Sequence, residues 1–177
     1  PGNSELPIDT FFQKMRAGVP VTTAQINTFA FMNAFEPALK DGEDVIYIGF
    51  SSGLSGTIGS ARAAAEELAA RYPERKVACV DSLSASLGEG LLVYYAARRQ
   101  DQMDFDAMVS WIETNKLRFV HWFTVDDLVY LKRGGRVSGA TAAIATVLNI
   151  KPVMHVDDEG HLVAVHKVQG RKKSLSA

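Results

Sequence analysis

Hydroxyl side chains and glycines are concentrated in one short segment of the sequence. Four hydroxyl residues and two glycines lie within the seven residues from Ser51 to Thr57, between an apolar run and an amphipathic pattern. A turn from a buried strand into a helix exposes backbone N–H groups at the positive end of the helix dipole, where an anion is stabilised. Capping a helix requires only one hydroxyl. We therefore predict an anion-binding turn, with these candidate contacts: Ser51, Ser52, Ser55 and Gly56.

The same segment also matches a catalytic motif. Residues 49–53 fit the G-x-S-x-G nucleophile elbow of serine hydrolases, which would make Ser51 the nucleophile. Such an enzyme needs a histidine and an oxyanion loop, yet no histidine and no Gly-Gly run precedes the motif. A serine hydrolase therefore stays an alternative to a binding protein. The nominal histidine partners are His121, His155, His161 and His166.

Two more hydroxyl-rich segments could contribute to the same site. Thr22 and Thr23 lie in the segment 21–25, between an extended stretch and a helix that Asn27 is expected to cap. The segment 81–86 follows the next strand, and the ends of parallel strands meet at one edge of a sheet. An ordinary loop would also explain the first segment, and helix capping would also explain the second.

The sequence does not favour other site chemistries. It contains no G-x-x-x-x-G-K-[ST] loop, no G-x-G-x-x-G motif after a strand and no i, i+4 histidine pair, so we predict no cofactor and no metal. A net charge of -1 gives no field that would attract nucleic acid. No apolar run approaches the roughly 18 residues of a membrane span, so we expect no integral membrane association. The single Cys79, in an apolar run, favours a reducing, cytoplasmic compartment.

A strand, a helix and a second strand must position the Ser51–Thr57 turn. Residues 44–50 are apolar and rich in β-branched and aromatic side chains, and residues 76–80 form a second apolar run. Between them, residues 58–72 repeat apolar side chains at a spacing of three and four. With 47% hydrophobic residues, the 177-residue chain can bury such a core. This order predicts a right-handed βαβ unit with parallel strands.

The rest of the chain divides into helices and a hairpin. The turn residues 157–160 separate the apolar runs 152–156 and 161–168, which is typical of an antiparallel hairpin. We therefore expect an α/β protein. A parallel βαβ sheet with flanking helices should occupy residues 1–120, and a smaller mixed α/β part with the hairpin should occupy residues 121–177. The other expected elements are helices at 10–17, 27–39, 87–99, 105–116, 125–132 and 139–147, and a strand at 118–124.

Several blocks of sequence, taken in this order, resemble the DegV family. Segment 21–25 stands where that family has a Thr-Ser-Gln-Pro loop, and residues 51–61 (SSGLSGTIGSA) and 128–136 (LVYLKRGGR) match specific blocks. Shorter matching blocks are Val80-Asp81-Ser82, Asn149-Ile150-Lys151-Pro152 and Gly170-Arg171-Lys172-Lys173. The departures from the family pattern are Ala24, Ile26 and Gln169. The resemblance covers nearly the whole chain, although the family extends beyond both of its ends.

The resemblance implies a protein that binds a long-chain fatty acid and is not itself an enzyme. A threonine of the first loop and a serine of the second would hold the carboxylate, which points to Thr23 and to Ser52 or Ser51. The acyl chain would lie in an apolar tunnel. A carboxylate-contacting histidine of the family falls beyond residue 177, so none of the four histidines takes that role.

The resemblance also implies a partner fatty acid kinase, which would supply ATP and phosphorylate the presented acid. The basic residues Lys132, Arg133 and Arg136 are candidates for docking that kinase, or form a solvated flank of a glycine turn. A regulatory interaction protein that works without lipid is the third alternative.

Overall fold

The Ser51–Thr57 turn belongs to a βαβ unit, in a computed structural model that describes residues 6–137 and 150–177. The helix α3 (Thr57–Arg71) connects strand β1 (Val45–Gly49) to strand β2 (Val77–Asp81). The two strands pair with each other in parallel, as the sequence predicts. Val45 lies opposite Val77, and Gly49 lies opposite Asp81. The loops that follow the two strands therefore leave the sheet at the same edge.

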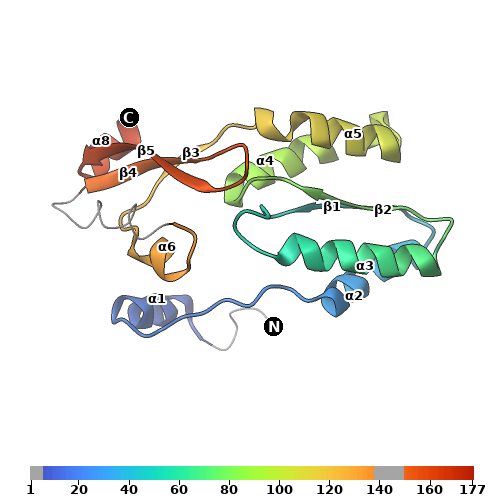
Figure 1. The fold of residues 1–177 in the computed structure, drawn as a ribbon, viewed down its shortest axis with the longest axis horizontal. Coiled ribbons are helices and arrows are strands. Elements are labelled where there is room, and N and C mark those ends of the chain that lie inside the picture. The colour runs from blue at the N-terminus through green and yellow to red at the C-terminus, as the bar shows by residue number, and fades with distance from the viewer. Residues whose placement is uncertain (1–5, 138–149) are drawn as a thin grey trace.

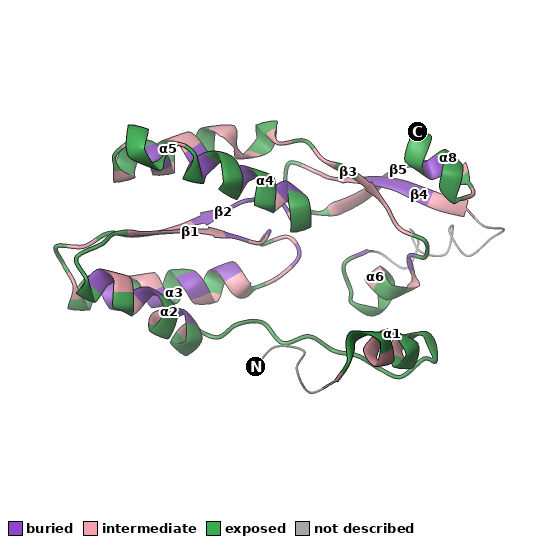
Figure 2. Ribbon diagram, turned by 180° about the vertical axis from the view of Figure 1, so that it is seen from behind, coloured by how far each residue is buried: buried purple, intermediate pink, exposed green. Residues whose placement is uncertain are grey.

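Helices cover both faces of this parallel sheet (Figure 1). α2 (Thr28–Lys40) and α3 pack on one face, and α4 (Ser86–Ala97) and α5 (Phe105–Asn115) pack on the other. The buried residues lie between these layers (Figure 2). The first core contains Phe31, Phe35, Leu39, Ala61, Ala64 and Leu68. The second contains Val80, Leu92, Ala96, Met108 and Ile112.

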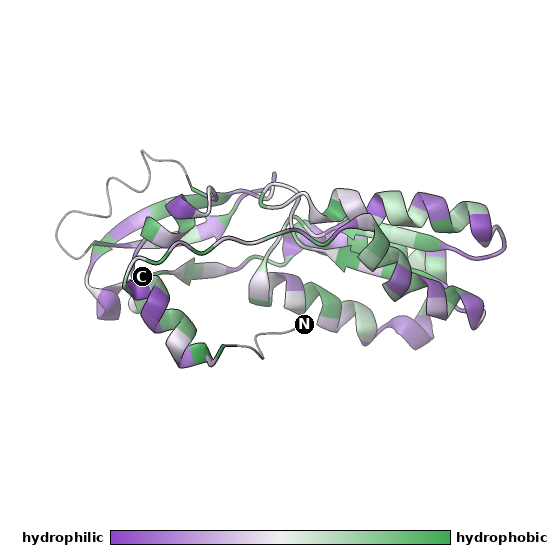
Figure 3. Ribbon diagram, turned by 90° about the horizontal axis from the view of Figure 1, so that it is seen from below, coloured by the Kyte–Doolittle hydropathy of each residue, from purple (hydrophilic) through white to green (hydrophobic). Residues whose placement is uncertain are grey.

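A second sheet is antiparallel, with the strand order β3-β4-β5. Its small core contains Leu128, Val137 and Met154, and Figure 3 shows that both hydrophobic and hydrophilic residues lie on the strands of the protein. Its strands are β3 (Trp122–Thr124), β4 (Ile150–Val156) and β5 (Leu162–Gln169). The remaining helices of the described residues are α1 (Ile8–Arg16), α6 (Val129–Arg133) and α8 (Arg171–Ser176), and short 3-10 turns span Gln100–Gln102 and Lys116–Arg118.

The predicted α/β class, with a parallel sheet and an antiparallel hairpin, is confirmed. The strand expected over 118–124 is shorter, because a 3-10 turn ends at Arg118. The helix expected over 125–132 begins only at Val129, α8 was not predicted, and the helix expected over 139–147 lies outside the described residues. The division into two domains near residue 120 stays a prediction. Among the described helices, none combines the length and the apolar character that crossing a membrane requires.

Asn27 caps α2 as the sequence predicts, because its Oδ1 accepts a hydrogen bond of 2.9 Å from the N–H of Ala30. Replacing Asn27 with alanine leaves this N–H without its partner, so we expect the free energy of unfolding to fall by about 1 kcal/mol. Urea unfolding measures the change. The matched control is Asn33→Ala, at an exposed position of the same helix, where a change within about 0.5 kcal/mol is expected. Equal stability of the two variants would contradict a stabilising cap.

Candidate functional site

Ser51 is a buried residue whose backbone hydrogen bonds hold the turn between β1 and α3. Its side chain and backbone are fully buried, at 0% exposure. Its N–H donates to the carbonyl of Ser84 at 2.9 Å, which ties the turn to the loop after β2. Its own carbonyl accepts from the N–H groups of Leu54 and Ser55, both at 3.1 Å. These bonds fix the backbone from which the rest of the turn projects.

Asp81, at the end of β2, holds the same two loops together from the other side. It is 6% exposed, and its Oδ1 accepts from the N–H of Ser52 at 3.2 Å and from the N–H of Leu83 at 3.1 Å. The expectation that both loops share one sheet edge is thus confirmed. Leu83 adopts a left-handed backbone with a φ of 50°, which is costly for a residue with a side chain. The contact with Asp81 helps to hold that conformation.

The backbone donors of the turn are largely used inside the protein, which differs from the expected anion cradle of free N–H groups. The N–H of Ser52 is bound to Asp81, the N–H of Gly53 donates to Ser51 Oγ at 3.1 Å, and the N–H of Thr57 donates to Ser55 Oγ at 3.3 Å. Hydroxyl groups in a tight turn compete for nearby N–H groups, because they lie within reach of their own backbone. Side-chain hydroxyls are therefore the more suitable contacts for a ligand.

The four candidate residues of the turn differ in their access to solvent. Ser52 and Gly56 are exposed, whereas Ser51 is buried and Ser55 is half-buried. The Oγ of Ser55 shares a hydrogen bond of 2.8 Å with Thr57 Oγ1. Ser52 is therefore the serine of this turn whose hydroxyl is best placed to meet a ligand from outside.

The hydroxyl-rich segment 21–25 lies beside this turn, because Gln25 contacts the first residues of α3 and Gly56. The sequence does not predict this contact. Gln25 Nε2 donates to Ser60 Oγ at 3.4 Å. A Cβ atom at Gly56 would lie 2.6 Å from Gln25 Oε1, so the glycine permits this close approach. Thr23 is exposed and precedes Gln25 by two residues. The structure thus brings the loop to the N-terminus of α3, although it places Gln25 rather than Thr23 in contact there.

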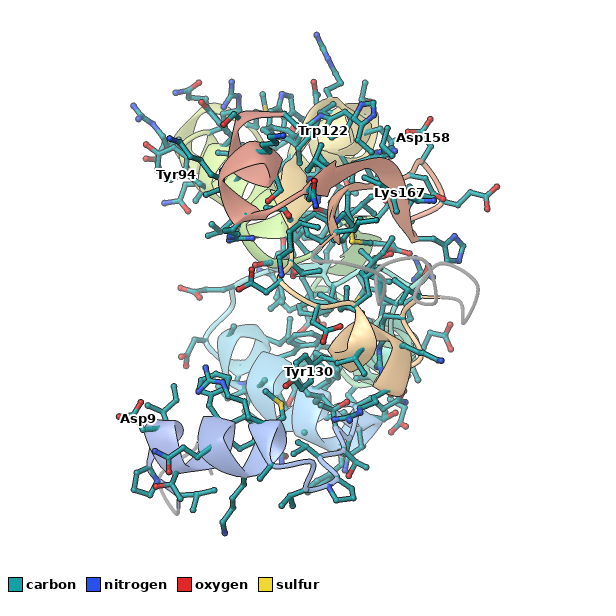
Figure 4. All side chains as sticks on the ribbon, turned by 90° about the vertical axis from the view of Figure 1, so that its left-hand side faces the viewer. Asp9, Tyr94, Trp122, Tyr130, Asp158 and Lys167 are labelled. Atoms are coloured by element: carbon teal, nitrogen blue, oxygen red, sulfur yellow. The ribbon has the colours of Figure 1, made fainter. Side chains whose placement is uncertain are left out.

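The basic segment 132–136, which includes the end of α6, also reaches the Ser51–Thr57 turn. Arg136 Nε donates to the carbonyl of Leu54 at 3.2 Å, and its Nη1 donates to the carbonyl of Gly134. Lys132 and Arg133 are exposed, and the guanidinium of Arg133 lies 5.7 Å from the ring centroid of Tyr130, which is labelled in Figure 4. The three candidate docking residues therefore lie on a segment that contacts the Ser51–Thr57 turn, which we call the ligand turn.

A further contact comes from the hairpin between β4 and β5, which sequence reasoning missed. Ser51 Oγ donates to the carbonyl of Gly160 at 2.8 Å, in a buried hydrogen bond between residues that are 109 positions apart. Gly160 has a φ of 82°, which favours glycine. The sequence predicts the hairpin turn itself but not its contact with Ser51. The site is therefore built from both sheets.

The sequence and the fold of this chain have known relatives. The family model of the uncharacterised DegV proteins matches residues 2–177. The chain belongs to the DegV family. A DegV domain-containing protein of Clostridium perfringens is 48% identical over 174 residues, which are 98% of this chain and 60% of the relative. The DegV chain thus spans about three fifths of the length of this relative.

Two solved structures show what similar proteins bind. A DegV family protein from Thermus thermophilus, described for its fatty acid binding, has a TM-score of 0.77 and 35% identity, over 93% of this chain and 57% of that one. The Fatty Acid Kinase (Fak) B3 protein of Streptococcus pneumoniae was solved loaded with linoleic acid. It has a TM-score of 0.87 and 26% identity, over 98% of this chain and 61% of that one.

The hydrolase alternative is not supported by the geometry of the DegV chain. Ser51 is buried, and its hydroxyl proton is directed at the Gly160 carbonyl rather than at a histidine. The Nε2 atom of His121 lies 3.5 Å from Ser84 Oγ, and its Nδ1 atom lies 3.2 Å from the Phe119 carbonyl oxygen. The other histidines contact different groups. His155 and His166 stack on Trp122, and His161 lies beside Asp157 and Glu159.

Two other features of the DegV chain lie outside the candidate site. Burial raises the pKa of the Cys79 thiol to about 11, so this thiol is protonated at neutral pH and is not an activated nucleophile. A hollow of about 660 Å³ lies between α8 and the antiparallel sheet. Its lining includes Trp122, Thr124 and His166 but none of the candidate carboxylate contacts. Within residues 6–137 and 150–177, no cluster of three or more histidine, cysteine or acidic side chains could hold a metal ion.

Proposed function

We propose that this protein binds a long-chain fatty acid by its carboxylate and presents it to a partner fatty acid kinase. One observation carries the proposal: the exposed hydroxyl of Ser52 lies at a strand-to-helix turn, in a family with solved members that hold fatty acids. The kinase would supply ATP and transfer its γ-phosphoryl group to the carboxylate oxygen. The product would be an acyl phosphate, and this protein would supply only the bound acid.

The carboxylate of the ligand needs hydrogen-bond donors, and the accessible ones here are hydroxyls. Ser52 and Thr23 are exposed, and Gly56, which lacks a side chain, allows Gln25 of the Thr23 loop to lie close to the turn. Ser55 is less exposed than Ser52, and its hydroxyl shares a hydrogen bond with the hydroxyl of Thr57, which helps to fix the turn. A hydrogen bond to a charged acceptor is worth about 1.5–3 kcal/mol, so one or two hydroxyls orient the head group without dominating the affinity.

The nearby carboxylate of Asp81 is compatible with an anionic ligand, because two backbone N–H groups already stabilise its charge. Most of the affinity would come from the acyl chain. Removing a methylene group from water contributes about 0.8 kcal/mol. A buried chain of many methylenes therefore outweighs the contribution of the head group.

Kinase docking beside the site is supported by the position of the basic segment. A kinase must bring its phosphoryl donor to the carboxylate, so its docking surface has to lie next to the ligand turn. Lys132 and Arg133 are exposed, and Arg136 contacts the Leu54 carbonyl of that turn. These three cations would pair with acidic groups of the kinase, and steering of this kind weakens as salt increases.

Replacing Ser52 with alanine is expected to weaken fatty acid binding about 10-fold or more, because a charge-assisted hydrogen bond is lost. The experiment uses the intact protein, with any sequence beyond these 177 residues. Binding is measured by the fluorescence of cis-parinaric acid, and native mass spectrometry identifies any fatty acid that co-purifies. Ser110→Ala, at an exposed position of α5, is the matched control and should bind as the wild type does.

Two results would contradict the proposal. The first is a wild-type protein that co-purifies with no fatty acid and does not bind the fluorescent acid. The second is specific labelling of Ser51 by a fluorophosphonate probe, which would favour a serine hydrolase.

A further inference from the structure

The hairpin turn between β4 and β5 reaches from the antiparallel sheet to the end of the parallel sheet (Figure 1). At its tip, the Gly160 carbonyl accepts the buried hydrogen bond of 2.8 Å from Ser51 Oγ. Asp158, in the same turn, is exposed and points away from the molecule (Figure 4). The turn therefore presents its backbone, rather than its acidic side chains, to the ligand turn.

The two backbones approach so closely that glycine is required on both sides. A Cβ atom at Gly160 would lie 2.1 Å from Ser51 Oγ and 3.3 Å from the Cα of Leu83. A Cβ atom at Gly53 would lie 2.8 Å from the carbonyl oxygen of Gly160. Real Cβ atoms do not approach other atoms at the shorter of these distances. The hairpin turn is thus in direct contact with the loops after β1 and β2.

The hairpin turn is itself a rigid support. The Oδ1 of Asp157 accepts from the N–H of Glu159 at 3.0 Å and from the N–H of His161 at 2.8 Å. The N–H of Gly160 donates to the Asp157 carbonyl at 3.0 Å. A turn with this many internal hydrogen bonds keeps its shape. Its Gly160 carbonyl is therefore a fixed point for Ser51.

Ser51 Oγ uses both of its hydrogen-bonding roles on the protein. It donates to Gly160 and accepts from the N–H of Gly53 at 3.1 Å. In the chain, Ser52 lies between Ser51, which carries this oxygen, and Gly53, whose N–H it accepts. A displacement of the hairpin turn would therefore displace Ser51 and, with it, the backbone on both sides of Ser52.

We propose that Ser51 is a positioning residue, which fixes the hydroxyl of Ser52 toward the carboxylate by fastening the ligand turn to the hairpin of the other sheet. This inference rests on the proposed function, because it presumes that Ser52 meets a fatty acid. It assigns different tasks to the two adjacent serines. Ser52 contacts the ligand, and Ser51 contacts only the protein.

The test compares Ser51→Ala with Ser52→Ala in the intact protein, using cis-parinaric acid as the ligand. Amide hydrogen exchange of Gly53, followed by NMR without ligand, is the second readout. We expect Ser51→Ala to weaken binding about 5- to 10-fold, because loss of one net hydrogen bond is worth about a factor of ten. It should also accelerate exchange of the Gly53 amide at least about 10-fold. Ser52→Ala should weaken binding and leave that exchange unchanged.

The outcomes separate the two proposals. If Ser52→Ala weakens binding and Ser51→Ala does not, the positioning role is overturned and the proposed function stands. If Ser51→Ala weakens binding with unchanged exchange at Gly53, Ser51 touches the ligand and the inference is also overturned. A wild-type protein that does not bind the acid overturns the proposed function itself. If Ser51→Ala does not fold, Ser51→Cys replaces it under the same criteria, because a thiol of similar shape is a weak donor.

Discussion

Replacing Gly160 with alanine is expected to lower the free energy of unfolding by about 3–6 kcal/mol, one of the two largest effects that we expect in this chain. Three costs combine. An alanine with a φ of 82° adopts a left-handed backbone, which costs roughly 1–2 kcal/mol. The new Cβ would lie 2.1 Å from Ser51 Oγ, and forcing such a contact apart costs about 1–3 kcal/mol. Separation of the two loops also removes the hydrogen bond between Ser51 and Gly160, worth about 1 kcal/mol.

Gly42 supplies a matched control for this variant. It has the same φ of 82°, and a Cβ atom placed there would meet nothing within 4 Å. Gly42→Ala therefore carries the backbone cost alone, about 1–2 kcal/mol. Urea unfolding of both variants measures the difference, which reports the contact between the hairpin and the ligand turn. Equal losses in the two variants would mean that the hairpin turn does not press on Ser51.

The βαβ unit could be predicted from the sequence because its signals are local. The apolar run that became β1, the spacing of Ile58, Ala61 and Leu68 in α3, and the cap at Asn27 each depend on a few neighbouring residues. Parallel pairing followed from the order of the elements. This prediction placed the loops after β1 and β2 at one edge, where the hydrogen bond from Ser52 to Asp81 is found.

The contacts that decide the roles of the two serines could not be predicted in this way. Ser51 and Ser52 are identical residues at adjacent positions, and only the hairpin 109 residues away gives Ser51 its buried partner. The same holds for Arg136, whose contact with the Leu54 carbonyl spans 82 positions. The left-handed backbone of Leu83 has no sequence signal either, because residues with side chains adopt it only where tertiary contacts enforce it.

These long-range contacts change the physical picture of the site. A strand-to-helix turn with free N–H groups would attract an anion, but here the N–H groups of Ser52, Gly53 and Thr57 are bound within the protein. Under the proposed function, selectivity for a carboxylate would come from hydroxyl groups held in fixed positions. A site of this kind depends on the rigidity of its surroundings more than on its charge.

The second large effect concerns α4, where two glycines in the same helix should respond to alanine with opposite sign. A Cβ atom at Gly88 would lie 2.4 Å from Nδ1 of His121, whereas a Cβ atom at Gly90 would meet nothing within 4 Å. Alanine stabilises a helix relative to glycine by about 0.5–1 kcal/mol. Gly90→Ala should therefore raise the free energy of unfolding by that amount.

Gly88→Ala should instead lower the free energy of unfolding by about 1–3 kcal/mol, because the His121 ring must move. That movement also breaks its contacts with Ser84 and with the Phe119 carbonyl. The two variants should thus differ by about 1.5–4 kcal/mol in urea unfolding. In a His121→Ala background the ring is absent, so Gly88→Ala should become stabilising, as Gly90→Ala is. If Gly88→Ala remains destabilising in that background, the packing of α4 against His121 is not the cause. The carbonyl of Ser84 also accepts a hydrogen bond from the N–H of Ser51. Loss of the packing against His121 would therefore also disturb the ligand turn.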